Sequence, residues 1–230
     1  MQKCLAGIYA NRDWPDPDKG QAAMITRMDG DIGRLLDLLN ELSIDENTLV
    51  FFTSDNGPHD ESNHDLERFN PSGPLTGIKR SLTEGGVRVP MIARWPGKIK
   101  AGTVSEHVGY FADVLPTLID LTGAKTEVTT DGISFLPTLT GSGKQKEHEY
   151  LYWEFYEQGS RQSVRFGDWV AIRQPMFSGS ASLFNLKQDI AEQNDLAKQH
   201  PELVAKAVAY MEQAHTPNQN WAPSGAPVKK

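Results

Sequence analysis

Asp55 and Asn56 have the clearest chemical potential in this sequence, because they follow directly on an apolar run at residues 48–54. If that run is a strand of an open α/β sheet, its carboxyl end is where ligands bind. A carboxylate and an amide oxygen are ligands that hard cations such as Ca²⁺ and Mg²⁺ accept. Gly57 would let the chain turn sharply away. Asp-Asn-Gly is also ordinary turn chemistry, and these residues taken alone favour an Asx turn.

A long loop at residues 55–86 carries four further candidates, His59, His64, Asp65 and Lys79. The loop contains five glycines and three prolines. It is far longer than the median connection of about 4–6 residues, and such loops are usually functional or disordered. A single histidine is more often a surface residue than a catalyst. A lysine such as Lys79 is usually solvated, and it gains a chemical role only where the loop folds over an anion.

Residues 84–90 join a flexible glycine pair to an extended segment that ends in a proline. A structural turn is the preferred interpretation of this segment. Arg88 could bind an anion or pair with a carboxylate, and the sequence leaves both possibilities open. Nucleotide cradles and serine-hydrolase triads are unsupported, because the sequence contains neither a glycine-rich phosphate-binding motif nor a G-x-S-x-G turn.

The helices and strands that must position these residues are predicted to form an α/β region in the first part of the chain. Apolar residues spaced by three and four predict an amphipathic helix at residues 18–42. The continuous apolar run at residues 48–54 predicts a strand covered on both faces, as in a parallel sheet. Residues 87–95 predict a second strand, which ends at a Pro-Gly turn. A helix leading into a buried strand is typical of α/β folds.

A further helix is predicted at residues 114–121, with Asp113 as its N-cap and Gly123 just beyond its end. The pattern then changes to that of a small antiparallel sheet with a packed helix. We expect strands, a hairpin and a final helix at residues 150–155, 163–172, 183–186 and 201–214. The sequence therefore predicts an α/β core at residues 1–145 and a C-terminal α+β subdomain at residues 146–230.

Composition excludes several classes of protein. The 230 residues carry a formal net charge of −7, which argues against a general nucleic-acid binder. The single cysteine, Cys4, cannot form an internal disulfide. No uncharged apolar run approaches the roughly 18 residues needed to span a bilayer, so we expect no membrane partner. The first residues also lack the apolar segment and cleavage site of a signal peptide.

Taken in order, these segments resemble the C-terminal half of the sulfatase family, within the alkaline-phosphatase-like superfamily. The resemblance extends from about residue 8 to residue 215. Each segment alone is weakly diagnostic, but their order is specific. The matching segments are residues 24–34, 54–57, 73–79, 84–90, 95–97, 113–118, 131–134, 183–186 and 195–197, followed by the terminal helix. The resemblance implies an α/β fold, a partial alkaline-phosphatase-like sulfatase core with a small C-terminal antiparallel sheet plus helix.

The resemblance also implies a hydrolase that cleaves sulfate esters. In the family, a formylglycine hydrate attacks sulfur while Ca²⁺ and basic residues neutralise the sulfate and the alcohol leaves. Asp55 and Asn56 match two ligands of the single Ca²⁺, which reverses the preference for a plain turn. Lys79 matches the lysine that holds a sulfate oxygen and assists the leaving group.

The substrate that the resemblance implies is a sulfate ester, and more narrowly a sulfated sugar. His59, His64 and Asp65 lie in a loop that often reaches the substrate in carbohydrate sulfatases, so they are the predicted substrate-binding residues. The family implies a periplasmic or secreted protein, although the sequence itself assigns no compartment.

One departure from the family is large. Formylglycine arises from Cys or Ser in a C/S-x-P/A-x-R segment. Cys4, followed by Leu5, Ala6 and Gly7, does not complete that segment, because Ile8 stands where the Arg is required. The chain thus resembles a sulfatase without the half that bears the nucleophile, and we expect it to be inactive alone. Its Ca²⁺ site is expected to be incomplete, since Ca²⁺ usually takes 6–8 oxygen ligands. An unpaired sheet edge could support an oligomer.

Two alternatives remain open at this stage. A metal-dependent phosphatase or phosphodiesterase of the same superfamily usually holds two zinc ions and has Asp-His at the position of Asp55 and Asn56, so Asn56 favours a single hard cation. A non-catalytic carbohydrate-binding fragment would keep the loop that faces the sugar without turning over a substrate.

Overall fold

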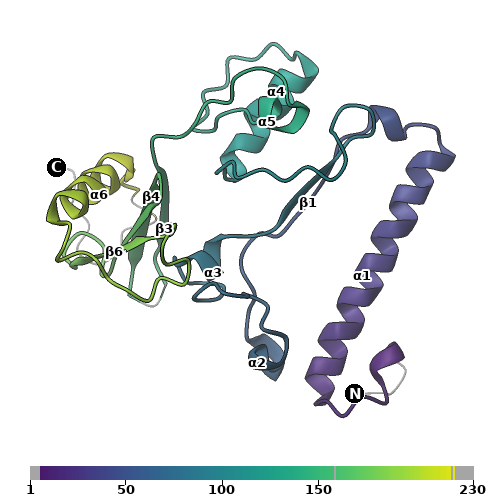
Figure 1. Cartoon of the computed structure of the whole chain (residues 1–230), viewed down its shortest axis with the longest axis horizontal. Helices are drawn as coiled ribbons and strands as arrows, with labels where there is room; N and C mark the ends of the chain where they lie inside the picture. The colour runs from purple at the N-terminus through teal and green to yellow at the C-terminus, as the bar shows by residue number, and fades with distance from the viewer. Residues whose placement is uncertain (1–5, 158, 219, 221–230) are drawn as a thin grey trace. The chain divides into compact units, whose positions relative to one another are not determined.

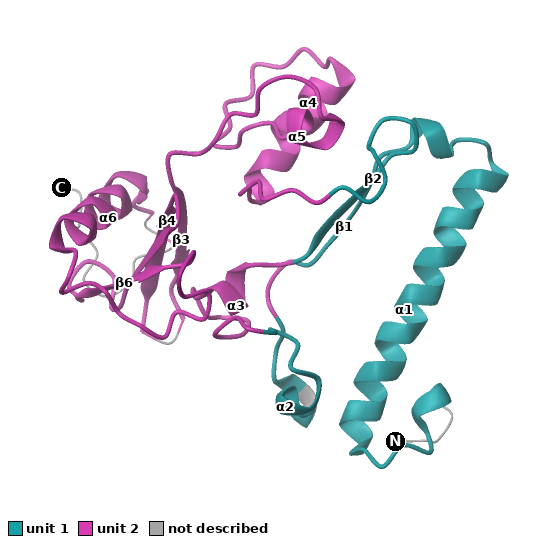
Figure 2. Cartoon of the chain, viewed as in Figure 1, with its two compact units in different colours: residues 1–54, 58–73, 90–103 teal, residues 55–57, 74–89, 104–230 magenta. Residues whose placement is uncertain are grey.

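A computed structural model describes residues 6–157, 159–218 and 220 of the chain (Figure 1). Cys4 lies outside the described residues. The chain divides into two compact units, coloured separately in Figure 2. The first unit comprises residues 1–54, 58–73 and 90–103, and the second comprises residues 55–57, 74–89 and 104–230. The predicted domain division at residue 145 remains a prediction.

The longest element of the first unit is helix α1, Asp16–Glu41, which confirms the helix predicted from spacing (Figure 1). Asp16 and Asp18 lie in its first turn, where carboxylates interact favourably with the helix dipole. The helix keeps much of its apolar stripe in solvent, because Met24 is 64% exposed and Leu35 is 61% exposed. The periodicity therefore identified a helix correctly, while the described residues of this chain leave its apolar stripe largely uncovered.

Strands β1, Val50–Thr53, and β2, Met91–Arg94, form the two-stranded sheet of the first unit. They pair antiparallel, with Phe52 opposite Ile92. The expected parallel arrangement is therefore wrong for this pair. The expected cover on both faces of β1 is also wrong, since Phe52 is 36% exposed. An apolar run records a tendency to be buried, but it contains no information about the direction of the neighbouring strand.

Short helical segments complete the first unit. The 3₁₀ turn η3, Asp45–Asn47, is held to β2 by the Arg94 guanidinium, which pairs with the Asp45 carboxylate. The remaining ones are η2, Gly7–Tyr9, η4, Glu61–Asn63, and α2, Leu66–Phe69. The last two lie within the stretch that the sequence indicated only as a long loop.

The second unit begins with short helices. Helix α3, Glu84–Val87, occupies part of the segment that was predicted to be extended, so β2 begins later than expected. Helix α4, Val114–Thr122, follows the 3₁₀ turn η5, Phe111–Asp113, and α5, Leu136–Thr140, comes next. Gly123 ends α4 with a φ of +66°, as predicted.

Asp113 occupies the N-cap position of α4 as predicted, but its carboxylate makes no capping hydrogen bond to that helix. It accepts hydrogen bonds from the amides of Tyr110 and Ile133 at 3.0 and 2.7 Å, and from His148 Nε2 at 2.8 Å. Its side chain is fully buried. The residue therefore ties three segments of the second unit together.

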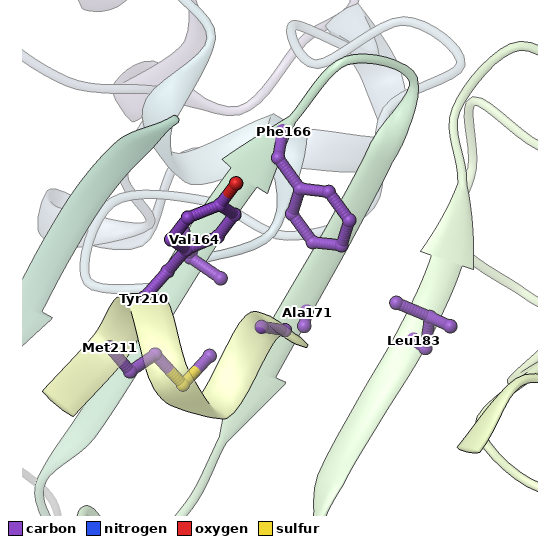
Figure 3. Close-up of a cluster of buried hydrophobic side chains, with 7 residues drawn as sticks. Val164, Phe166, Ala171, Leu183, Tyr210 and Met211 are labelled. Carbon is purple, nitrogen blue, oxygen red and sulfur yellow. The ribbon is translucent and has the colours of Figure 1, made fainter. Parts of the chain in front are cut away.

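The C-terminal sheet matches its sequence prediction closely. Strands β3, Leu151–Phe155, β4, Arg161–Phe166, β5, Trp169–Arg173, and β6, Ala181–Asn185, form an antiparallel sheet in the order β3-β4-β5-β6. Helix α6, Pro201–Ala214, packs on this sheet. The core between them is shown in Figure 3 and consists of Val164, Phe166, Ala171, Leu183, Ala207, Tyr210 and Met211. None of the helices in the described ranges combines the length and the hydropathy of a membrane span.

Candidate functional site

Asp55 and Asn56 stand at the end of strand β1, as the sequence indicated. Asp55 is exposed and Asn56 is half-buried. The Asn56 side-chain amide donates to the carbonyl of Gly57 at 2.9 Å, which holds the asparagine against its own turn. The pair therefore presents a solvent-accessible carboxylate beside an oriented amide.

Gly57, which follows this pair, packs closely against the backbone of helix α3. Its amide donates to the Gly86 carbonyl at 2.9 Å. A Cβ atom on Gly57 would lie only 1.9 Å from the carbonyl oxygen of Gly85. The glycine is therefore required by close backbone approach, and its contact fixes the end of the Asp55–Asn56 turn to helix α3.

Lys79 lies in a tight turn that belongs to the same unit as Gly57. The Ser81 amide donates to the Ile78 carbonyl at 2.9 Å, and Arg80 has a φ of +77°, which is typical of a type II turn. The carbonyl of Thr76 accepts from the Gly85 amide at 2.8 Å. Residues 76–86 therefore form one hydrogen-bonded stretch, which carries Lys79 and also supports Gly57. We call it the Lys79 stretch.

Two carboxylates lie on the buried side of the Lys79 stretch. Glu84 belongs to the stretch, and Glu192 packs against it. Glu84 is 3% exposed, and its carboxylate lies 3.3 Å from Arg88 Nη1 and 3.5 Å from Arg165 Nη1. Its amide donates to Glu192 Oε2 at 2.7 Å. Burial, together with the negative charge of Glu84 and Asp189, raises the pKa of Glu192 to about 7.

Sequence reasoning did not find Glu84 and Glu192 as members of this site. Arg88 gave the available signal, since it was expected to meet either an anion or a carboxylate, and the structure shows it beside Glu84. Glu192 lies 108 residues away from Glu84 in sequence. Local patterns carry no information about a contact of that range.

His59 and His64 lie together in the first unit, with ring centroids 5.4 Å apart and planes at 89°. His59 Nδ1 accepts from the Glu61 amide at 3.0 Å. His64 Nδ1 donates to the Glu61 carbonyl at 2.8 Å, so that His64 carries a proton on Nδ1. Both rings are thus held through their Nδ1 atoms by the backbone of Glu61, which lies between them.

Asp65 follows these histidines and caps helix α2. Its Oδ1 accepts from the amides of Glu67 and Arg68 at 2.9 and 3.4 Å. The Asp65 amide donates to Asp18 Oδ1 at 2.7 Å, and Arg68 Nε donates to Asp18 Oδ2 at 2.6 Å. These hydrogen bonds give Asp65 a structural role. Its role in substrate binding remains a prediction.

Asp18 was missed by sequence reasoning, although it fixes this loop to α1. Its side chain is fully buried. Burial alone would raise the pKa of Asp18, but the Asp65 amide and the Arg68 guanidinium outweigh that effect and lower it. The carboxylate is therefore held in its charged form between the helix and the loop.

The predicted site residues thus fall into two groups. Asp55, Asn56 and Lys79 belong to the second unit, where Gly57 joins their segments. His59, His64 and Asp65 belong to the first unit. Within the described residues, no cluster of three or more His, Cys, Asp or Glu side chains could hold a metal ion. The oxygens of Asp55 and Asn56 alone do not fit the 6–8 ligands that Ca²⁺ takes.

Two family models match the chain. One, described as Sulfatase, matches residues 11–124, and the other, described as N-sulphoglucosamine sulphohydrolase, C-terminal, matches residues 78–216. Among curated proteins, the steryl-sulfatase of Mus musculus is 38% identical over 152 residues, which cover 64% of this chain and 24% of the relative. The N-acetylgalactosamine-6-sulfatase of Canis lupus familiaris is 35% identical over 170 residues, covering 72% of this chain and 31% of the relative.

Solved structures give a consistent result. The crystal structure of Ps i-CgsB has a TM-score of 0.78 and 28% identity, covering 93% of this chain and 46% of that protein. The same protein in complex with k-i-k-neocarrahexaose has a TM-score of 0.76 and 29% identity, covering 88% of this chain and 44% of that protein. The chain spans about a quarter to a third of the first curated relatives and less than half of these structures.

Proposed function

This chain belongs to the sulfatase family, whose fold is alkaline-phosphatase-like, and on that basis we propose that it is part of an enzyme that hydrolyses a sulfate ester of a carbohydrate. The curated relatives include an N-acetylgalactosamine-6-sulfatase. A structural relative has been solved with a bound neocarrahexaose. Both names support a sugar as the alcohol that carries the sulfate.

The observation that carries this proposal is the contact between Gly57 and Gly86. It joins the turn of Asp55 and Asn56 to the Lys79 stretch at the level of the backbone. Oxygen ligands for a cation and a lysine for an anion are thereby supplied by two segments of one packed unit. Sulfate-ester cleavage needs such a combination, because negative charge on the sulfate and on the leaving oxygen must be neutralised.

We assign roles to the chain's own residues as follows. Lys79 would neutralise a sulfate oxygen and stabilise the leaving alcohol as a compact point charge. Asp55 and Asn56 would provide two ligands of the family's cation, which supplies Lewis-acid polarisation of the sulfate when it is bound. The other ligands and the formylglycine would have to come from polypeptide outside these residues.

His59 and His64 are proposed to contact the sugar. Their Nδ1 atoms are engaged by the backbone of Glu61, so that the Nε2 atoms are the ones that could bond to hydroxyl groups. Asp65 is proposed to act with them, although one of its oxygens caps α2. Histidine pairs of this kind can both donate and accept hydrogen bonds, which suits the hydroxyls of a carbohydrate.

We also propose that the isolated chain does not hydrolyse sulfate esters. Its sequence offers no C/S-x-P/A-x-R segment, and the apolar stripe of α1 remains largely exposed. The partial coverage of the relatives is consistent with this view.

Sulfate release from 4-nitrophenyl sulfate and from a sulfated oligosaccharide tests the proposal. We expect no release by the chain alone. We expect release when the chain is co-expressed with the part of Ps i-CgsB that it does not match, under conditions in which formylglycine forms. Lys79→Ala should abolish that activity, whereas Lys98→Ala, at an exposed lysine, should not. A folded, associated pair that releases no sulfate would contradict the proposal, as would turnover by the chain alone.

The phosphatase alternative is not favoured, because the matched families and the relatives named above are sulfatases. Zinc-dependent hydrolysis of 4-nitrophenyl phosphate by the same pair, without sulfate release, would reverse that preference. The purely carbohydrate-binding alternative would be supported if the pair bound the sulfated oligosaccharide but released no sulfate from it.

A further inference from the structure

The segment around Glu192 makes a concentrated set of contacts with the Lys79 stretch. Glu192 Oε2 accepts from the Glu84 amide at 2.7 Å. The Thr76 hydroxyl donates to the carbonyl of Ala191, and Gln193 Nε2 donates to the Thr76 hydroxyl at 2.9 Å. Three consecutive residues that follow strand β6 therefore hold both ends of the stretch that carries Lys79.

The Glu192 side chain is unusual in its surroundings. It is only 6% exposed, and its Oε1 is buried without a hydrogen-bond partner among the described residues. A buried carboxyl oxygen without a hydrogen-bond partner is energetically unfavourable. The backbone of Glu192 also adopts a φ of +53°, a value that residues other than glycine rarely take. The fold thus tolerates two unfavourable features in order to place one acceptor against the Glu84 amide.

The effect of this acceptor extends to the Asp55–Asn56 turn. Glu84 is directly followed by Gly85 and Gly86, and Gly86 accepts the Gly57 amide at 2.9 Å. This backbone is closely packed, since a Cβ on Gly86 would lie 2.2 Å from the Ser81 carbonyl oxygen. A shift of the Glu84 amide would therefore be transmitted to Gly57 and to the residues before it.

We infer that Glu192 is a positioning residue, whose carboxyl group fixes the Glu84 amide and thereby the relative placement of Lys79 and the Asp55–Asn56 turn. Through Glu192, the segment after β6 would therefore help to shape the candidate site. The inference rests on the proposed function for its meaning. Its structural content can be tested without any turnover.

Amide hydrogen exchange on the 230-residue chain, measured residue by residue by NMR, tests the inference. Glu192→Ala should speed exchange of the Glu84 amide by about tenfold or more, as expected for losing a hydrogen bond to a carboxyl group. The Gly57 amide should exchange faster as well. The Leu183 amide, which is bonded to Asp195, should change little. Glu127→Ala, at an exposed glutamate of the same unit, is the matched control and should leave all these rates unchanged.

The conservative variant separates positioning from general structural support. Glu192→Gln keeps a carbonyl oxygen for the Glu84 amide, and it should restore slow exchange at Glu84 and Gly57. If the alanine variant fails to fold, Gln193→Ala removes a neighbouring contact on Thr76 and should loosen the same amides to a smaller degree. Unchanged exchange at Glu84 in a folded Glu192→Ala chain would overturn the inference. So would loosening of Glu84 that leaves Gly57 protected, and neither result depends on whether the complete enzyme cleaves sulfate.

Discussion

Replacing Asp18 by asparagine should detach the loop that carries His59 and His64 from helix α1. Asp18 is fully buried and receives the Asp65 amide on one oxygen and Arg68 Nε on the other, at 2.7 and 2.6 Å. An asparagine of the same shape offers one acceptor oxygen instead of two and carries no charge. It can therefore keep only one of the two hydrogen bonds.

The magnitude follows from these contacts. A hydrogen bond to a charged group is worth about 1.5–3 kcal/mol. Removing one partner of a fully buried ion pair costs about 3–5 kcal/mol, but the Arg68 side chain is 31% exposed, so water can solvate it after the change. We therefore expect Asp18→Asn to lower the free energy of unfolding of the first unit by about 2–3 kcal/mol.

Urea unfolding and exchange of the Asp65 amide would measure this loss. Asp29→Asn, at an exposed position of the same helix, is the matched control. Because the pKa of Asp18 is lowered in the fold, its stabilising effect is present above the ordinary carboxyl pKa of about 3.9 and is lost as the pH falls. The difference between wild type and Asp18→Asn should accordingly shrink in acid. A difference at neutral pH that is no larger than that of Asp29→Asn would refute the reasoning.

Three other predictions concern the second unit. Gly57→Ala should destabilise the chain, because its Cβ would lie 1.9 Å from the Gly85 carbonyl oxygen; a thermal midpoint equal to that of wild type would contradict this. Because the pKa of Glu192 is raised to about 7, the stability should fall as the pH rises from about 4.5 to above 7, by up to about 3 kcal/mol. Glu192→Gln should flatten that profile, and an unchanged profile in urea unfolding would argue against it. Calorimetric titration should show weak or no Ca²⁺ binding by the isolated chain, and a tight stoichiometric signal lost in Asp55→Asn would disprove this.

Local patterns predicted much of this fold. The spacing of apolar residues placed α1 and α6 correctly, and the hairpin predicted at residues 163–172 corresponds to β4 and β5, which have Phe166 opposite Trp169. These elements are decided within a few turns or one strand pair. Their signals are therefore present in short windows of sequence.

The sequence could not predict features that depend on distant partners. The direction of β1 relative to β2 depends on the path of the chain between them, which composition does not encode. Asp18 appeared as one more polar residue at a helix start, because its partners, Asp65 and Arg68, lie 47 and 50 residues away. Within the candidate site, the pattern identified Asp55 and Asn56 as chemically interesting, but it contained no signal for Glu192.

The packing of Gly57 against Gly85 and Gly86 has a consequence for how the site could change over time. Main-chain atoms make this contact, so its dimensions do not depend on any side-chain rotamer. Neighbouring side chains could therefore be exchanged to suit a different ligand while the spacing between the two loops stays constant. The three glycines themselves would tolerate no such exchange, because every other residue adds the Cβ atom for which there is no space.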